Sequence, residues 1–128
     1  MKQIKEIWRE AFHINRDGTT LKLRHLEVST HGRVRSSRTG KPITTYQHSN
    51  RDSKHSYTTF AAQPDGGRRR SFTVGRVTAS TFFRRSYLPN FVVDHIDGNT
   101  MNNNLDNLRW LSNGDNIWLG NNQQENEE

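Results

Sequence analysis

The stretch VVDHIDGNTMNNNLDNLRW, residues 92–110, joins two short apolar runs through a loop crowded with asparagines. The first run reads as a strand of buried type that ends in Asp94 and His95. Adjacent residues of a strand point to opposite faces, so these two side chains can serve one site only where the strand ends or bulges. The pattern therefore predicts a polar site at the end of this strand.

The connection after this strand has the composition of a hydrogen-bonded loop. Residues 97–99, Asp-Gly-Asn, are typical of a turn, and asparagine side chains bond readily to nearby main-chain groups. Residues 102–104, three asparagines in a row, are interpreted as loop scaffolding. Short polar side chains of this kind can hold a long loop in place without an apolar core.

Residues 108–112, LRWLS, predict a second strand whose leucine and tryptophan share one face. Ser112 and Asp115 have the spacing of a capping box, so a helix should begin there and carry Asn116 in its first turn. The order strand, loop, strand, helix would allow Asn116 to converge with the Asp-His pair.

Composition limits the kind of protein that this chain can form. Its 128 residues are about one domain's length, and only 30% of them are hydrophobic, with a mean hydropathy of −1.02. There is no cysteine, which excludes a disulfide framework and a cysteine-ligated zinc site. Any metal must therefore be held by oxygen or imidazole ligands, and no structural zinc is expected.

Charge is distributed unevenly along the chain. Residues 1–90 hold 18 lysines and arginines against 6 acidic residues, whereas residues 91–128 hold one arginine against 7. A basic body next to a small acidic segment is typical of a protein that binds a polyanion and concentrates carboxylates at one site, as a divalent cation requires. The alternative is a solvated basic surface without a partner.

The part of the chain before the opening stretch reads mainly as short strands. Residues 1–12 read as a short helix or an extended arm. Alternation in residues 21–29, 32–37 and 41–49 indicates an antiparallel meander. Trp8 should anchor the N-terminal segment.

Three further patterns complete the chain. Residues 64–67, Pro-Asp-Gly-Gly, separate two β-rich runs and predict a hairpin. Residues 76–86 have helical spacing, and Pro89 blocks continuation of that helix. Residues 121–128 form a polar, acidic tail that is expected to be disordered. Five histidines outside the opening stretch are expected to have no special role, and these are His13, His25, His31, His48 and His55.

Residues 94–116, DHIDGNTMNNNLDNLRWLSNGDN, resemble the HNH endonuclease family in the ββα-metal version found in phage and intron-encoded homing endonucleases. The resemblance covers the Asp-His pair, the Asn-rich loop, the Asn-Leu-Arg-Trp strand and an asparagine on the closing helix. Upstream, residues 6–8 (EIW) and 26–37 (LEVSTHGRVRSS) resemble NUMOD4, a DNA-binding module that often precedes this nuclease.

The resemblance implies an α+β fold in two parts. Residues 1–88 would form a NUMOD4-like basic DNA-binding region, built as an antiparallel β-meander with short helices. Residues 89–120 would form the HNH ββα-metal nuclease motif. The chain departs from many relatives at residues 75–78, where Gly-Arg-Val-Thr stands in place of His-Arg-Leu-Val, so any role of that histidine is absent. It also ends without the helix-turn-helix module that some homing endonucleases append.

The resemblance further implies roles for four residues. Asp94 and Asn116 would supply oxygen ligands to one divalent cation, Mg²⁺ or Mn²⁺. His95 would be the general base that activates the attacking water, and Asn107 would fix the loop or orient His95 through hydrogen bonds. Because Mg²⁺ keeps several of its waters, one or two protein ligands are sufficient.

Arginines on the predicted strands and at the end of the predicted helix would hold the nucleic acid. A twisted sheet or ribbon can enter the major groove or lie along phosphates, and most of these contacts should be to phosphates. The arginines assigned to DNA binding are Arg33, Arg35, Arg38, Arg68, Arg69, Arg70, Arg84 and Arg85.

These features predict a metal-dependent DNA endonuclease that nicks or fully cleaves double-stranded DNA, as a monomer or a homodimer. One alternative is a DNA-binding accessory protein that retains the HNH fold but does not cleave. Another is a structural RNA-binding protein, which the basic surface permits but which gives no reason for an Asp-His pair at a strand end. Without a visible signal peptide or membrane span, we expect a soluble cytoplasmic protein, in the bacterial host cell if a phage encodes it.

Overall fold

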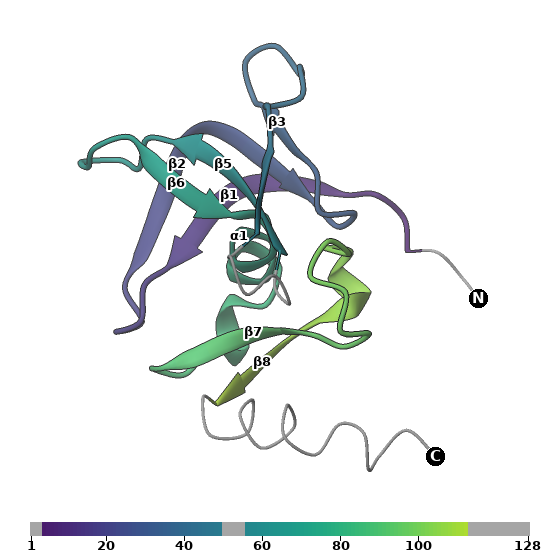
Figure 1. The fold of residues 1–128 in the computed structure, drawn as a ribbon. Helices are drawn as coiled ribbons and strands as arrows, with labels where there is room; N and C mark the ends of the chain where they lie inside the picture. The colour runs from purple at the N-terminus through teal and green to yellow at the C-terminus, as the bar shows by residue number, and fades with distance from the viewer. Residues whose placement is uncertain (1–3, 50–55, 113–128) are drawn as a thin grey trace.

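The computed structural model describes residues 4–49 and 56–112 (Figure 1). These residues form small antiparallel sheets around one α-helix. The first two sheets contain β1 (Trp8–Ile14), β2 (Thr20–Ser29) and β3 (Val34–Ser36), then β4 (Tyr46–Ser49), β5 (Ser56–Ala62) and β6 (Arg70–Thr73). The remaining elements are α1 (Val74–Phe82), the 3₁₀ turn η1 (Arg84–Ser86), β7 (Phe91–His95), the 3₁₀ turn η2 (Leu105–Asn107) and β8 (Leu108–Ser112).

The first two sheets each have three strands in sequence order. Both β1-β2-β3 and β4-β5-β6 are antiparallel, as the alternation predicts. The predicted hairpin at residues 64–67 joins β5 to β6 and is confirmed. Residues 8–14 are a strand, so the extended alternative holds there and the helical one is wrong. The strand predicted over 41–49 is confined to its second half.

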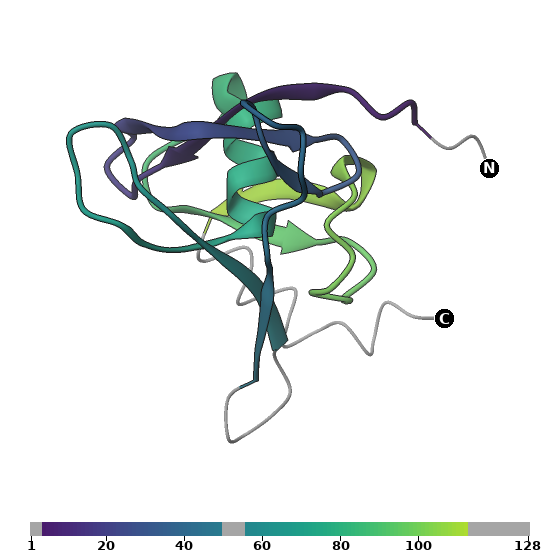
Figure 2. The same ribbon diagram turned by 90° about the horizontal axis from the view of Figure 1, so that it is seen from above.

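Helix α1 lies between the sheets and the β7–β8 hairpin, as both views show (Figures 1 and 2). Val74 and Val77 are buried in a core shared with the first two sheets, in which Phe60 is fully buried. Ala79 belongs to a second core, where it packs with Ile14 and Trp110. The helix therefore connects the N-terminal sheets to the hairpin that carries the Asp-His pair.

The boundaries of this helix differ from the predicted 76–86. It begins at Val74, directly after β6, because the valine side chain is needed in the core and Gly75 is accommodated in the first turn. It ends at Phe82, since Phe83 leaves the helical region with φ −116° and ψ 29°. Arg84 and Arg85 therefore lie in the following 3₁₀ turn and not on the helix.

The two-stranded sheet β7–β8 departs from the prediction in its burial. Asp94 pairs with Arg109 and His95 pairs with Leu108 across the antiparallel ladder. All five β7 residues are only half-buried, so the prediction of a buried strand is wrong. The apolar run in β7 serves one packed face, on which Phe91 and Val93 contact the second core. Trp110 is a core residue, as expected, and its indole Nε1 donates to the carbonyl of Phe83 at 2.9 Å.

No helix among the described residues is long and apolar enough to cross a membrane.

One of the other histidines, His13, has an unusual environment. Its ring packs edge-on against Phe72, with 5.0 Å between ring centroids, and its buried Nδ1 has no hydrogen-bond partner among the described residues. Burial is the main reason why the pKa of His13 is lowered to about 4, and the charges of Arg76 and Arg70 contribute to this value in the same direction. The folded protein therefore holds this imidazole neutral.

Stability should fall as the pH drops from about 6.5 to about 4, because the unfolded chain binds a proton at His13 before the folded chain does. Since the ring is only partly buried, we expect a loss of about 1–2 kcal/mol in unfolding free energy. Urea unfolding at both ends of this range would measure it. His13→Phe should remove this component, whereas His48→Phe, at an exposed site on β4, should keep the wild-type pH dependence.

Candidate active site

Asp94 and His95 end strand β7 and turn to opposite sides of the hairpin. The carboxylate Oδ2 of Asp94 accepts a hydrogen bond from Arg109 Nε at 2.8 Å, across the strand pair. His95 turns toward α1, and its Nε2 lies 2.9 Å from the side-chain oxygen of Asn103. The strand end thus provides one ion-paired carboxylate and one oriented imidazole within two consecutive residues.

The loop after β7 is organised around the carboxylate of Asp97. Its Oδ1 accepts from the main-chain N–H of Asn99 at 2.8 Å and from Asn107 Nδ2 at 2.9 Å, and its Oδ2 accepts from Asn102 Nδ2 at 2.9 Å. These bonds, led by the one from Asn102, lower the pKa of Asp97. The predicted asparagine-bonded loop is confirmed, and its centre is an aspartate.

Asn107 closes the loop from the other end. Its side-chain oxygen accepts from the main-chain N–H of Asp97 at 3.0 Å, and its Nδ2 also donates to the carbonyl of Asn102 at 2.9 Å. Its own carbonyl accepts from Ile96 N–H at 2.8 Å. Asn107 was predicted either to fix the loop or to orient His95, and these contacts correspond to fixing the loop. The side chain that contacts His95 is that of Asn103.

Removing the carboxylate of Asp97 should disorganise this loop. We expect Asp97→Ala to lower the unfolding free energy by about 2 kcal/mol, because three donors lose a charged acceptor. Thermal or urea unfolding would measure the loss. Asp106→Ala provides a control at an exposed acidic residue of the same loop and should be close to wild type. Equal losses in the two variants would show that Asp97 has no special structural role.

The prediction missed Asn103, which was grouped with its two neighbours as scaffolding. Asn103 is 7% exposed, whereas Asn102 and Asn104 are half-buried. No local signal distinguishes the middle of three identical residues. Its environment comes from Gly32 and Gly75, which lie far away in the sequence and leave space for it.

The donor atoms at this strand end are oxygens, which suit Mg²⁺ or Mn²⁺. Of the two predicted metal ligands, Asp94 lies within the described residues, and its side chain is 20% exposed. Asn116 and the helix predicted to carry it lie outside the described residues. Within residues 4–49 and 56–112, no three acidic, histidine or cysteine side chains cluster as a metal site. The residues are compatible with a cation that keeps most of its waters.

The arginines assigned to DNA binding fall into two groups. Three of them have polar partners within the protein. Arg33 forms a two-point ion pair with Glu6, Arg35 bonds Glu27 at 3.0 Å, and Arg38 lies 2.9 Å from His25. Arg35 also lies over the ring of Trp8, 3.9 Å from its centroid, as does Arg33 at 5.8 Å, so the two guanidinium groups lie on one face.

The other five arginines have no acidic partner among the described residues. Arg70 lies over Phe72 and Arg84 over Phe12, at 4.4 and 4.3 Å from the ring centroids. Arg68, Arg69 and Arg85 are exposed. These five guanidinium groups are available to an external polyanion.

Glu6 is a second residue that the prediction missed. It accepts from Arg33 and from the hydroxyl of Ser29, at 2.8 Å for the latter, and lies 3.5 Å from the His31 ring. The bond from Arg33 is the main reason why the pKa of Glu6 is lowered to about 2. The Thr30 hydroxyl accepts from Ile7 N–H at 3.0 Å. Glu6 and Thr30 together anchor the N-terminal arm to the end of β2.

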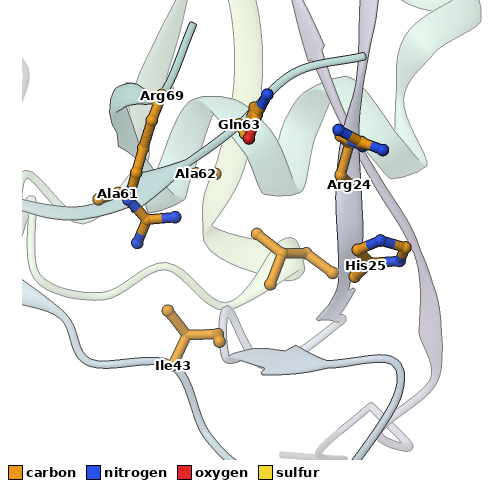
Figure 3. A pocket seen from close by; sticks show the side chains of 8 residues that line it. Arg24, His25, Ile43, Ala61, Ala62, Gln63 and Arg69 are labelled. Carbon is orange, nitrogen blue, oxygen red and sulfur yellow. The ribbon is translucent and has the colours of Figure 1, made fainter.

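A shallow pocket of about 290 Å³ lies between β2 and the β5–β6 connection (Figure 3). Arg24 and His25 line it from β2, while Arg69 and Gln63 line it from the β5–β6 connection. Its floor is apolar and includes Ile43. None of its lining residues belongs to the β7–β8 segment, so this pocket is separate from the strand-end site.

Comparison with known proteins gives a family match over the segment that contains the strand end and its loop. Residues 85–117 match the family model described as HNH endonuclease. Over 89 residues the chain is 38% identical to DNA endonuclease I-HmuI of Bacillus phage SP01, and the aligned part covers 69% of this chain and 47% of that protein. The chain therefore spans about half the length of this curated relative.

A solved structure supports the relationship at the level of the fold. The structure that describes DNA binding and cleavage by the HNH homing endonuclease I-HmuI matches with a TM-score of 0.62 and 29% identity. The match covers 93% of this chain and 59% of the other. Together with the Asp-His strand end and the asparagine-bonded loop, these matches show that residues 85–117 are similar to the HNH endonuclease family.

Proposed function

We propose that this protein is a metal-dependent endonuclease that hydrolyses phosphodiester bonds in double-stranded DNA. The observation that carries the proposal is the position of His95. Its imidazole stands at the end of β7, half-buried, with Nε2 engaged by Asn103, so that one ring nitrogen is oriented while the other is left for a water molecule. An imidazole held in this way is suited to general-base catalysis near neutral pH.

The residues of the site divide the reaction between them. His95 takes the proton of the attacking water through a ring nitrogen. Asp94 and Asn116 would hold the divalent cation, and Asn107 keeps the loop closed around the strand end. When bound, Mg²⁺ or Mn²⁺ supplies charge stabilisation at the scissile phosphate and at the leaving oxygen.

DNA is bound by the basic part of the chain, which we assign as a NUMOD4-like region over residues 1–88. The HNH homing endonuclease whose structure is similar binds and cleaves DNA. Here the five arginines that have no acidic partner within residues 4–49 and 56–112 lie on the β5–β6 hairpin and after α1, the helix that packs against the site. They would contact phosphates and orient the duplex toward the strand end.

The alternative function is a DNA-binding accessory protein that does not cleave. The ion pair between Asp94 and Arg109, at 2.8 Å, favours it, because a guanidinium occupies the carboxylate that a cation would need. In the endonuclease, Asp94 would have to release Arg109 or contact it and the cation at the same time.

A plasmid assay tests the proposal. Supercoiled DNA incubated with the protein and Mg²⁺ or Mn²⁺ should become nicked or linear, and EDTA should prevent this. The balance of nicked and linear products reports whether one strand or both are cut. Duplex binding without cleavage, across both metals and several plasmids, would instead support the accessory protein. Tighter binding to RNA than to duplex DNA would contradict both.

A further inference from the structure

Asn103 lies between two glycines from separate parts of the fold. Its side chain is buried, and its Oδ1 lies 2.9 Å from His95 Nε2. Gly32 approaches it from the turn between β2 and β3, and Gly75 approaches it from the first turn of α1. The imidazole is therefore held by a residue whose own position depends on both neighbouring elements.

Gly32 allows the β2–β3 turn to pack directly on the loop. A Cβ atom at Gly32 would lie 2.4 Å from the carbonyl oxygen of Asn103 and 2.6 Å from its Cβ, so no larger residue fits there without a shift. Gly32 also has φ +72°, a conformation that favours glycine. The adjacent Thr30 carbonyl accepts from Leu105 N–H at 2.8 Å and ties the same turn to the loop.

Gly75 leaves room for the hydrogen bond itself. A Cβ atom at this position would lie 2.9 Å from Asn103 Oδ1 and 3.3 Å from His95 Nε2. Gly75 does not have a positive φ, so the helical backbone would accept an alanine there. The alanine Cβ is excluded only because it would lie too close to these two polar atoms. The glycine therefore serves the Asn103–His95 contact and not the helix.

We propose that Asn103 is a positioning residue that fixes the ring orientation and the tautomer of His95, with Gly32 and Gly75 as the neighbours that make its position possible. An amide oxygen can only accept, so the ring nitrogen facing it must carry the hydrogen. Nε2 is then the donor, and Nδ1 holds the lone pair that accepts the proton of water. This inference rests on the proposed function only for its consequence in catalysis.

The tautomer can be observed directly by ¹⁵N NMR of the His95 ring in the full chain, without metal or DNA, at a pH where the ring is neutral. Wild type should show a protonated Nε2 and an unprotonated Nδ1. Asn103→Ala should give a mixture of tautomers, while Asn103→Asp, which keeps an acceptor oxygen, should preserve the wild-type form. Asn104→Ala, at a neighbour whose amide bonds Asn102, is the matched control and should leave the spectrum unchanged.

Kinetics then separate positioning from folding. Under single turnover, Asn103→Ala should lower the cleavage rate about 10- to 100-fold, as loss of an orienting partner does elsewhere, with DNA affinity unchanged. Asn104→Ala should cleave like wild type. If Asn103→Ala fails to fold, Gly75→Ala provides the same test, because alanine favours the helix while displacing the contact. We expect its melting temperature to be retained or raised and its cleavage rate to drop at least 10-fold.

Two results would overturn the inference. One is a wild-type His95 protonated at Nδ1, which would mean that the amide of Asn103 faces the ring with its nitrogen. The other is a Gly75→Ala or Asn103→Ala protein that cleaves at the wild-type rate. Absence of cleavage by the wild type would contradict the proposed function alone, since the tautomer is measured without the reaction.

Discussion

Replacing His95 by alanine is expected to lower the rate of DNA cleavage by about 10²–10⁴-fold, the usual contribution of a general base. The affinity for duplex DNA should remain near that of wild type, because His95 lies at the strand end and not among the arginines of the β5–β6 hairpin and the turn after α1. Single-turnover cleavage of plasmid DNA at saturating protein, together with fluorescence anisotropy on a labelled duplex, would measure the two quantities separately.

A matched control makes the result specific. His48→Ala removes an exposed imidazole on β4 and should cleave like wild type. Added imidazole should restore part of the activity of His95→Ala, since a free base can occupy the space left by the ring. If binding and cleavage fall together in His95→Ala, and imidazole restores neither, His95 has a structural role and the assignment as base is wrong.

Affinity for duplex DNA should depend steeply on salt. If about six phosphates are neutralised, the slope of log affinity against log salt concentration should be about −5, which corresponds to a loss of about 10³ between 50 and 200 mM salt. Anisotropy titrations at four or five salt concentrations would give the slope. A slope near zero would exclude the basic region as the principal DNA contact.

The structure identifies which arginines should change this slope. Arg68 and Arg69 have no acidic partner among the described residues, so replacing both by alanine should reduce the slope by about 2. Arg35 is already paired with Glu27 and packed on Trp8, so Arg35→Ala should reduce it by less than 1. Equal changes in the two variants would show that internal ion pairs do not decide which arginines reach phosphates.

The salt experiment also bears on the ion pair between Arg33 and Glu6. The raised pKa of Arg33 and the lowered pKa of Glu6 both result from this contact, which anchors the N-terminal arm beside Ser29. A phosphate that engages Arg33 must compete with Glu6. Most of the slope should therefore come from the β5–β6 hairpin and the turn after α1.

Much of the fold could be predicted because its signals are local. Alternation places β2 and β3, the Pro-Asp-Gly-Gly turn places the β5–β6 hairpin, and the run after Asn90 places β7. The failures came from packing. Helix α1 begins at Val74 and not at the predicted residue 76, because Val74 packs in the core. Strand β7 is less buried than its apolar run suggests, because only one face of the hairpin packs against the second core.

The residue sequence by itself determined the location of the candidate site and the types of side chain that it contains. An Asp-His pair at a strand end, followed by an asparagine-rich loop, is a pattern of neighbouring residues, and neighbours in sequence stay neighbours in the fold. It also separated a basic body from an acidic segment, since charge is a property of composition.

Only the tertiary structure decided which asparagine contacts His95, which arginines form ion pairs among the described residues and why two glycines are required. Asn103 is one of three identical residues, and its selection depends on the approach of Gly32 and Gly75 from segments far apart in the chain. Arg33 and Arg68 look equivalent in sequence, but among the described residues Arg33 meets the carboxylate of Glu6 in the N-terminal arm and Arg68 meets none. These distinctions arise from close contacts between distant segments, which local propensity and charge patterning do not encode.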